Sequence, residues 1–150
     1  MRGAQVVSRV SRILKIVSEH PGGASSSAVA AAAGVATLEV IAEENLVDNA
    51  RVRGDQMLQG LTELAPKFGE IGNVRGLGLM AGIEFVDATG APDAAAAAAV
   101  QQACIPERLL TLTCGPMGNV VRLIPALVVT EDEIATGLNR FEAALTATLG

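Results

Sequence analysis

Arg122 is the residue of this sequence whose surroundings point most directly to binding chemistry. It lies in the apolar run VVRLIP, residues 120–125, which has the pattern of a short strand. A guanidinium in such surroundings is costly unless it is paired, and its planar fork matches a carboxylate through two parallel hydrogen bonds. Arg122 therefore either pairs with an Asp or Glu of its own chain or binds the carboxylate of a ligand, and the pattern alone favours neither.

The cysteines and the histidine exclude several classes of site. Cys104 and Cys114 are ten residues apart with no CxxC motif, and His20 is the only imidazole. A structural zinc site needs about four Cys or His ligands, so we expect no metal site. A catalytic nucleophile paired with His20, which sits beside a Pro-Gly-Gly turn, is also disfavoured. Two cysteines in a domain of this size are typical of a reduced chain, and we expect a cytoplasmic location.

The run GLGLMA, residues 76–81, fits the glycine pattern of dinucleotide-binding loops. That pattern functions only where it ends a strand and opens a helix whose N-terminus faces the pyrophosphate. Here the next residues, GIEFV at 82–86, have the pattern of a strand. We therefore interpret these glycines as points of close packing and not as a nucleotide site.

Composition and charge exclude a further class of function. The chain has 150 residues, enough for one domain, and a formal net charge of −5. The negative balance, with no Trp or Tyr and three Phe, argues against a nucleic-acid binder. Half of the residues are apolar. This composition fits a helix-rich soluble domain, or part of a larger protein that covers its apolar surface.

Apolar spacing and turn residues predict helices alternating with short strands. Helices are expected over residues 25–43, 46–64 and 93–103, and a fourth follows Thr130, which opens the capping box TEDE. Strands are expected over residues 71–75, 79–86, 109–113 and 120–124. The predicted fold class is α+β, a small antiparallel or mixed sheet of about four strands covered by helices and preceded by a long helix.

Two N-terminal segments are considered as a targeting segment and as a membrane span. Residues 1–18 carry Arg2, Arg9, Arg12 and Lys15 without any acidic residue, and we favour a solvated terminal helix over a targeting segment. Residues 21–38 carry no charge, close to the length of a membrane span. They are mostly Ala, Ser and Gly, with few large apolar residues, which favours a buried helix and no membrane association.

Three stretches in order resemble the class III pyridoxal-phosphate aminotransferases, and among them most closely the 4-aminobutyrate aminotransferases. The first is the Gly-Gly pair with the alanine-rich helix to EENL, residues 22–46, which resembles the helix that links the family's two domains. The second is IGNVRGLGLMAGIE, residues 71–84, and the third is LTLTCGPMGNVVRLIP with TEDEI and GL downstream. The resemblance covers about residues 20–149, roughly the last third of a family member. It implies the small domain of a fold-type I pyridoxal-phosphate enzyme.

The resemblance assigns roles to four residues. Arg122 matches the arginine that binds the substrate α-carboxylate. Gly22 and Gly23 match the Gly-Gly pair near the cofactor, and His20 stands where the family places a threonine that contacts the phosphate of pyridoxal phosphate (PLP). An imidazole can still donate a hydrogen bond there. We expect no catalytic residue in this chain, because neither Lys15 nor Lys67 matches the family's Schiff-base lysine segment.

These assignments predict three parts: an unmatched basic segment over residues 1–19, linking helices over 20–66, and an aminotransferase small domain over 67–150. The resemblance implies a PLP-dependent transfer of an amino group from 4-aminobutyrate or a similar ω-amino acid to 2-oxoglutarate. We expect the chain alone to be inactive, a truncated form whose partners are amino-acid and 2-oxo-acid substrates in a homo-oligomer or a mixed dimer. The alternatives are a non-catalytic module that associates with a full-length aminotransferase, and a carboxylate-binding domain that uses Arg122 without a cofactor.

Overall fold

The computed structural model describes residue 15, residue 19 and residues 25–150. The chain divides into two compact units, Met1–Leu46 and Val47–Gly150. In the first unit the main described element is helix α2 (Ser26–Glu43), which begins where the Ser25 side chain accepts a hydrogen bond from the backbone N–H of Ala28. Asn45 follows it with a φ of 50°, a left-handed conformation that asparagine tolerates and that ends the helix.

The exposure of helix α2 differs from the expectation drawn from the sequence. This helix was expected to be a buried helix, yet none of its residues is buried. Its apolar residues are mostly alanines distributed around the whole helix, so no single face is set apart to pack on a neighbour. Within the described residues, α2 is the one helix long and apolar enough to cross a membrane by length and composition.

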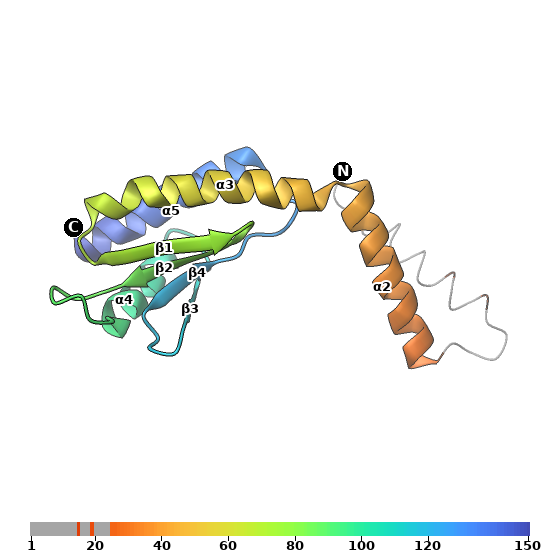
Figure 1. The fold of residues 1–150 in the computed structure, drawn as a ribbon, viewed down its shortest axis with the longest axis horizontal. Helices are drawn as coiled ribbons and strands as arrows, with labels where there is room; N and C mark the ends of the chain where they lie inside the picture. The colour runs from red at the N-terminus through yellow and green to blue at the C-terminus, as the bar shows by residue number, and fades with distance from the viewer. Residues whose placement is uncertain (1–14, 16–18, 20–24) are drawn as a thin grey trace. The chain divides into compact units, whose positions relative to one another are not determined.

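The second unit contains a four-stranded sheet and three long helices. The sheet has the order β1-β2-β4-β3, and every neighbouring pair is antiparallel. This arrangement confirms the predicted α+β class (Figure 1). In chain order the elements are α3 (Leu46–Leu64), the short helix η1 (Ala65–Lys67), β1 (Ile71–Leu77), β2 (Met80–Phe85), α4 (Ala94–Cys104), β3 (Leu112–Cys114), β4 (Val120–Leu123) and α5 (Glu131–Leu149).

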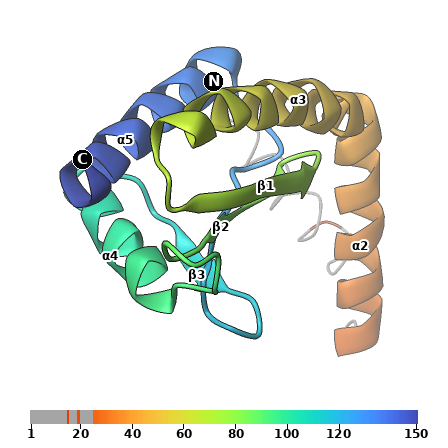
Figure 2. The same cartoon turned by 60° about the vertical axis from the view of Figure 1, so that its left-hand side comes forward.

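The hydrophobic core of this unit lies on one face of the sheet. Alternate residues of β2 and β4 point into it, and helices α3, α4 and α5 cover that face (Figures 1 and 2). The contributing sheet residues are Ala81, Ile83, Phe85, Val121 and Leu123. Phe85, Leu61, Phe141 and Val100, one from β2 and one from each helix, are among the largest side chains that are fully buried. The opposite face of the sheet is not covered by these three helices.

Local sequence signals account for where the helices begin. Thr130 and Glu133 form the predicted capping box of α5, each side chain bonded to the other residue's backbone N–H. Asp93 caps α4 by accepting from the backbone N–H of Ala96. The third strand differs most from its expected position: β3 lies at Leu112–Cys114 and not at residues 109–113. It begins later because a turn continues after α4, in which the Leu109 N–H donates to the Cys104 carbonyl.

Gly54 and Gly78 allow helix α3 to contact the β1–β2 hairpin. Gly78 occupies the two-residue loop of the hairpin with a φ of +52°, and no helix follows it, which agrees with the rejection of a nucleotide loop. A Cβ added to Gly54 would lie 2.3 Å from the Gly78 carbonyl oxygen. Gly54 is therefore required by packing, whereas the sequence indicated only a weak point in the helix.

We predict that Gly54→Ala destabilises the protein despite the higher helix propensity of alanine. The added methyl group meets backbone atoms that cannot rotate away, so we expect a loss of about 1–3 kcal/mol in the free energy of unfolding. Chemical denaturation with circular dichroism measures it. Gly34→Ala in α2 is the matched control, because nothing lies within 4 Å of a Cβ at that position. Equal effects of the two substitutions would contradict the packing role of Gly54.

Candidate carboxylate-binding site

Arg122 lies in the middle of the sheet, on the face opposite the core. It is paired across the strands with Gly82 of β2 and Leu112 of β3. Its chain neighbours Val121 and Leu123 are buried in the core, and successive side chains of a strand point to opposite faces. Because Gly82 has no side chain, β2 places nothing directly opposite the Arg122 side chain on this face.

The Arg122 guanidinium has no internal carboxylate partner among the described residues. Its Nε atom is buried and makes no hydrogen bond. The one nearby ion pair on this face joins Arg75 of β1 to Glu84 of β2, so that glutamate is already engaged. The internal ion pair left open by the sequence is therefore not formed within residues 25–150. An unsatisfied buried donor costs about 1–3 kcal/mol, which a bound carboxylate would relieve.

Three apolar side chains lie on the same uncovered face of the sheet as this guanidinium. Leu77 and Met80 face each other across the hairpin end, and Leu112 stands beside Arg122. All three are largely exposed, Leu77 at 85%. If another protein surface covers them, water is excluded from around Arg122, and its attraction to a carboxylate becomes stronger than in open solution. We define these three residues together with Arg122 as the open sheet face.

A buried asparagine, which the sequence analysis did not single out, fixes the start of β4. Asn119 is 3% exposed and its side-chain amide donates to the Phe85 carbonyl at 2.9 Å. The Phe85 N–H donates in turn to the Asn119 carbonyl at 2.8 Å. These two bonds tie the strand of Arg122 to the end of β2. The signal in the sequence was a lone amide directly before an apolar strand.

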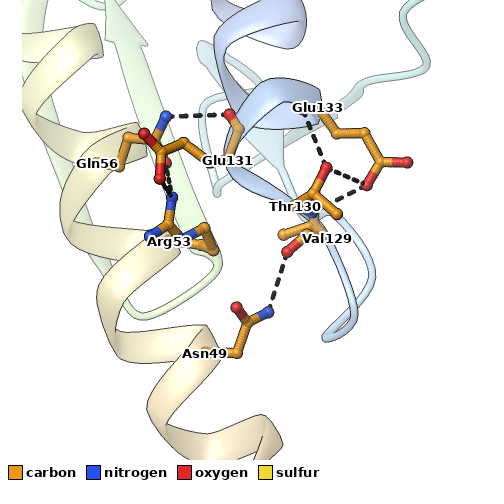
Figure 3. Close-up of polar contacts among 7 residues, drawn as sticks. All are labelled: Asn49, Arg53, Gln56, Val129, Thr130, Glu131 and Glu133. Atoms are coloured by element: carbon orange, nitrogen blue, oxygen red, sulfur yellow. Dashed lines mark hydrogen bonds and ion pairs between the residues drawn. The ribbon is translucent and has the colours of Figure 1, made fainter.

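Helix α3 fixes the segment that follows β4 (Figure 3). The Asn49 amide donates to the carbonyls of Leu127 at 2.7 Å and Val129 at 3.0 Å. One turn further along α3, Arg53 contacts the Glu131 carboxylate at 2.7 Å. In the next turn, the Gln56 amide donates to the Glu131 carbonyl at 3.1 Å. The strand that carries Arg122 is thus held at both of its ends.

The other predicted site residues receive no support from geometry. His20, Gly22 and Gly23 lie outside the described residues, so their assignment to the cofactor stays a prediction. Both cysteines are free, and burial is the main cause that raises the pKa of the Cys104 thiol. No cluster of His, Cys, Asp or Glu suited to a metal ion occurs within the described part of the chain.

Comparison with known proteins identifies the family. The family model described as Aminotransferase class-III matches residues 4–145. The chain belongs to the class III aminotransferases. The match begins inside the segment 1–19, which the sequence analysis had set apart as unmatched. Membership in this class implies dependence on PLP.

Curated relatives are about two fifths identical to the chain within the aligned region but are much longer than it. The diaminobutyrate–2-oxoglutarate aminotransferase of Haemophilus influenzae is 40% identical over 134 residues, which is 84% of this chain and 30% of that protein. The 4-aminobutyrate aminotransferase of Escherichia coli is 36% identical, over 79% of this chain and 29% of its own length. The chain therefore spans under a third of the relatives it matches.

Two solved structures have the same fold as this chain in the matched region. An aminotransferase from Bacillus anthracis superposes with a TM-score of 0.73 and 31% identity, over 80% of this chain and 28% of its own. A phospholyase from Arthrobacter, solved with phosphoethanolamine, gives a TM-score of 0.75 and 29% identity, over 79% and 29% of the two chains. The fold of the small domain is thus shared by proteins whose names describe different chemistry.

The two lysines do not fit the covalent attachment of PLP. Lys67, in η1, contacts the Glu142 carboxylate at 2.6 Å and its side chain is 56% exposed. Lys15 is 74% exposed and lies 3.9 Å from Glu19. A lysine that forms a Schiff base is usually buried away from water or placed beside another cation, whereas both of these lysines are exposed and lie beside a carboxylate. We therefore derive no chemical step on the cofactor from this chain.

We predict that the full chain forms no stoichiometric covalent adduct with PLP. After incubation with the cofactor, removal of the excess and borohydride reduction, peptide mass spectrometry should find only trace modification, no higher at Lys67 than at Lys15. Lys67→Arg keeps the charge beside Glu142 and serves as the control. A stoichiometric adduct at Lys67 that disappears in Lys67→Arg would contradict this interpretation.

Proposed function

We propose that this chain provides the carboxylate-binding small domain of a transaminase that moves an amino group from 4-aminobutyrate or a similar ω-amino acid to 2-oxoglutarate. Arg122 binds the α-carboxylate of glutamate or 2-oxoglutarate. A lysine-bearing partner chain supplies covalent attachment of PLP, and the chain alone is inactive. The free thiols Cys104 and Cys114 support a cytoplasmic location as part of this proposal.

The observation that carries the proposal is the unpaired Nε of Arg122 on the open sheet face. Arg75 also lies on this side of the sheet, but Glu84 neutralises it, so the uncompensated positive charge there is that of Arg122. The strand is anchored at both ends, so little conformational freedom is lost when a ligand binds. Arg122 thus orients a carboxylate without itself taking part in bond making.

The names of the relatives vary in both the amino acceptor and the amino donor. Two diaminobutyrate aminotransferases name 2-oxoglutarate as acceptor, and two taurine aminotransferases name pyruvate. The donors named by the relatives range from 4-aminobutyrate and 5-aminovalerate to taurine. One relative, from Pyrococcus horikoshii, is named an alanine/serine racemase. An arginine that holds the α-carboxylate is compatible with this range, and the choice of 4-aminobutyrate rests on the motif resemblance.

The Arg122 assignment is tested by calorimetric titration of the full chain with 2-oxoglutarate. We expect Arg122→Gln to weaken binding at least about 10-fold, because the charged, bidentate hydrogen bonds are lost. Arg51→Gln is the matched control: it removes the same charge from the exposed ion pairs of α3 and should leave binding within about 2-fold. Equal weakening by both substitutions would show a general charge effect and contradict a site at Arg122.

The alternative function is a non-catalytic module that associates with a full-length aminotransferase. The exposed leucines and methionine of the open sheet face favour it, because soluble monomers rarely leave contiguous apolar patches uncovered. Sedimentation of the chain mixed with such an enzyme separates the two functions. Association that survives Arg122→Gln but is lost in Leu77→Asp would support the module and leave carboxylate binding unsupported.

A further inference from the structure

One acidic side chain, that of Glu84, lies between two arginines on the uncovered face of the sheet. Glu84 is in β2, whereas Arg75 is in the neighbouring strand β1 and Arg122 is in β4 on the other side. Glu84 is also the single acidic residue in the four strands that the structure describes. The arginine with which it pairs therefore determines which of the two guanidinium groups keeps its charge uncompensated.

The strand register places Glu84 in the same diagonal relation to both arginines. On β1 its direct partner is Asn73, and Arg75 lies two residues further along, on the same face. On β4 its direct partner is Val120, and Arg122 again lies two residues further along. Diagonal neighbours in an antiparallel pair are about 7–8 Å apart, a separation that long side chains bridge. The Glu84 carboxylate is therefore within reach of either arginine.

In the structure Glu84 pairs with Arg75 and leaves Arg122 without a partner. The ion pair joins Nη1 of Arg75 to Oε2 of Glu84, and the buried Nε of Arg122 makes no hydrogen bond. The Glu84 side chain is 30% exposed, so an ion pair of this carboxylate is screened less than one in open solvent. Without Arg75, the other basic residue of the four strands that Glu84 reaches is Arg122.

Gly82 leaves the space between the two arginines free of side chains from β2. It lies directly opposite Arg75 on one side and directly opposite Arg122 on the other, so the three residues form one row across the sheet. Glu84 follows in the next row on the same face. Because glycine has no side chain, β2 places no group in this row that would keep the Glu84 carboxylate from Arg122.

We propose that Arg75 is a positioning residue for Arg122: by binding Glu84 it keeps this carboxylate away from the Arg122 guanidinium, which stays available to a ligand. This inference rests on the proposed function, in which Arg122 binds a substrate carboxylate. Glu84 and the ligand compete for the same guanidinium. The pair between Arg75 and Glu84 thus sets the affinity of the site without touching the ligand.

The test is calorimetric titration of the full chain with 2-oxoglutarate. Arg75→Gln should weaken binding about 3- to 10-fold, because Glu84 then pairs with Arg122. Arg75→Lys keeps a cation beside Glu84 and should stay within about 2-fold of the unsubstituted chain. Combining Arg75→Gln with Glu84→Gln should restore the affinity, since no competing carboxylate remains. A combined variant that binds as weakly as Arg75→Gln would show that Arg75 contacts the ligand itself, and would overturn the proposal.

A second combined variant separates contact from net charge. Arg75→Gln with Glu84→Asp has the same net charge as Arg75→Gln alone, but aspartate is one methylene shorter and does not span the diagonal as well. We expect this variant to recover most of the lost affinity. If it binds as weakly as Arg75→Gln, the loss is a general charge effect and the proposal is wrong. Circular dichroism checks that every variant is folded.

Nuclear magnetic resonance without ligand observes the pairing itself. The ¹⁵N resonance of the Arg122 Nε–H group, assigned by its absence in Arg122→Lys, should shift in Arg75→Gln and return to its original position when Glu84→Gln is added. An unchanged resonance in Arg75→Gln would overturn the proposal. If the unsubstituted chain does not bind 2-oxoglutarate, or Arg122→Gln binds it equally well, the proposed function is wrong. The ligand-free resonance then still decides whether Arg75 keeps Glu84 from Arg122.

Discussion

The alternation of side chains along β4 is the constraint on which the site depends. Val121 and Leu123 are held in the core, and the two-residue period of a strand then forces Arg122 onto the other face. A slip of the strand by one residue would bury the guanidinium and expose the two apolar side chains, at a cost of several kcal/mol. Core packing thus specifies which way the arginine faces.

The rest of the unit keeps that strand in place. Asn119 ties its beginning to β2, and α3 holds the segment beyond its end through Asn49, Arg53 and Gln56. Helix α3 is itself held against the β1–β2 hairpin by the contact between Gly54 and Gly78. The scaffold is one-sided: its three helices cover the core face and leave Arg122 facing outward with an unpaired donor.

Local patterns were sufficient to predict most of the secondary structure. The TEDE capping box, the Asp93 cap and the apolar runs of β2 and β4 each act over a few residues, so they are visible in the sequence. The bonds from Asn49 to Leu127 and Val129 join residues 78 and 80 positions apart, and no local pattern reveals them. The packing role of Gly54 is hidden for the same reason. Helix α2 was predicted as buried because residues 21–38 carry no charge and are mostly small, but burial depends on a neighbouring surface that no sequence pattern specifies.

The central claim is that the unpaired guanidinium of Arg122 binds a carboxylate. It is tested most directly by ¹⁵N NMR of the arginine Nε–H groups during titration with 2-oxoglutarate. The resonance that is absent in Arg122→Lys should shift downfield and exchange more slowly with water as the ligand saturates, because the buried Nε–H gains an acceptor. The Arg75 resonance should move little, since Glu84 already accepts from that side chain. An Arg122 resonance that is insensitive to the ligand, or a shift at Arg75 alone, would contradict the account.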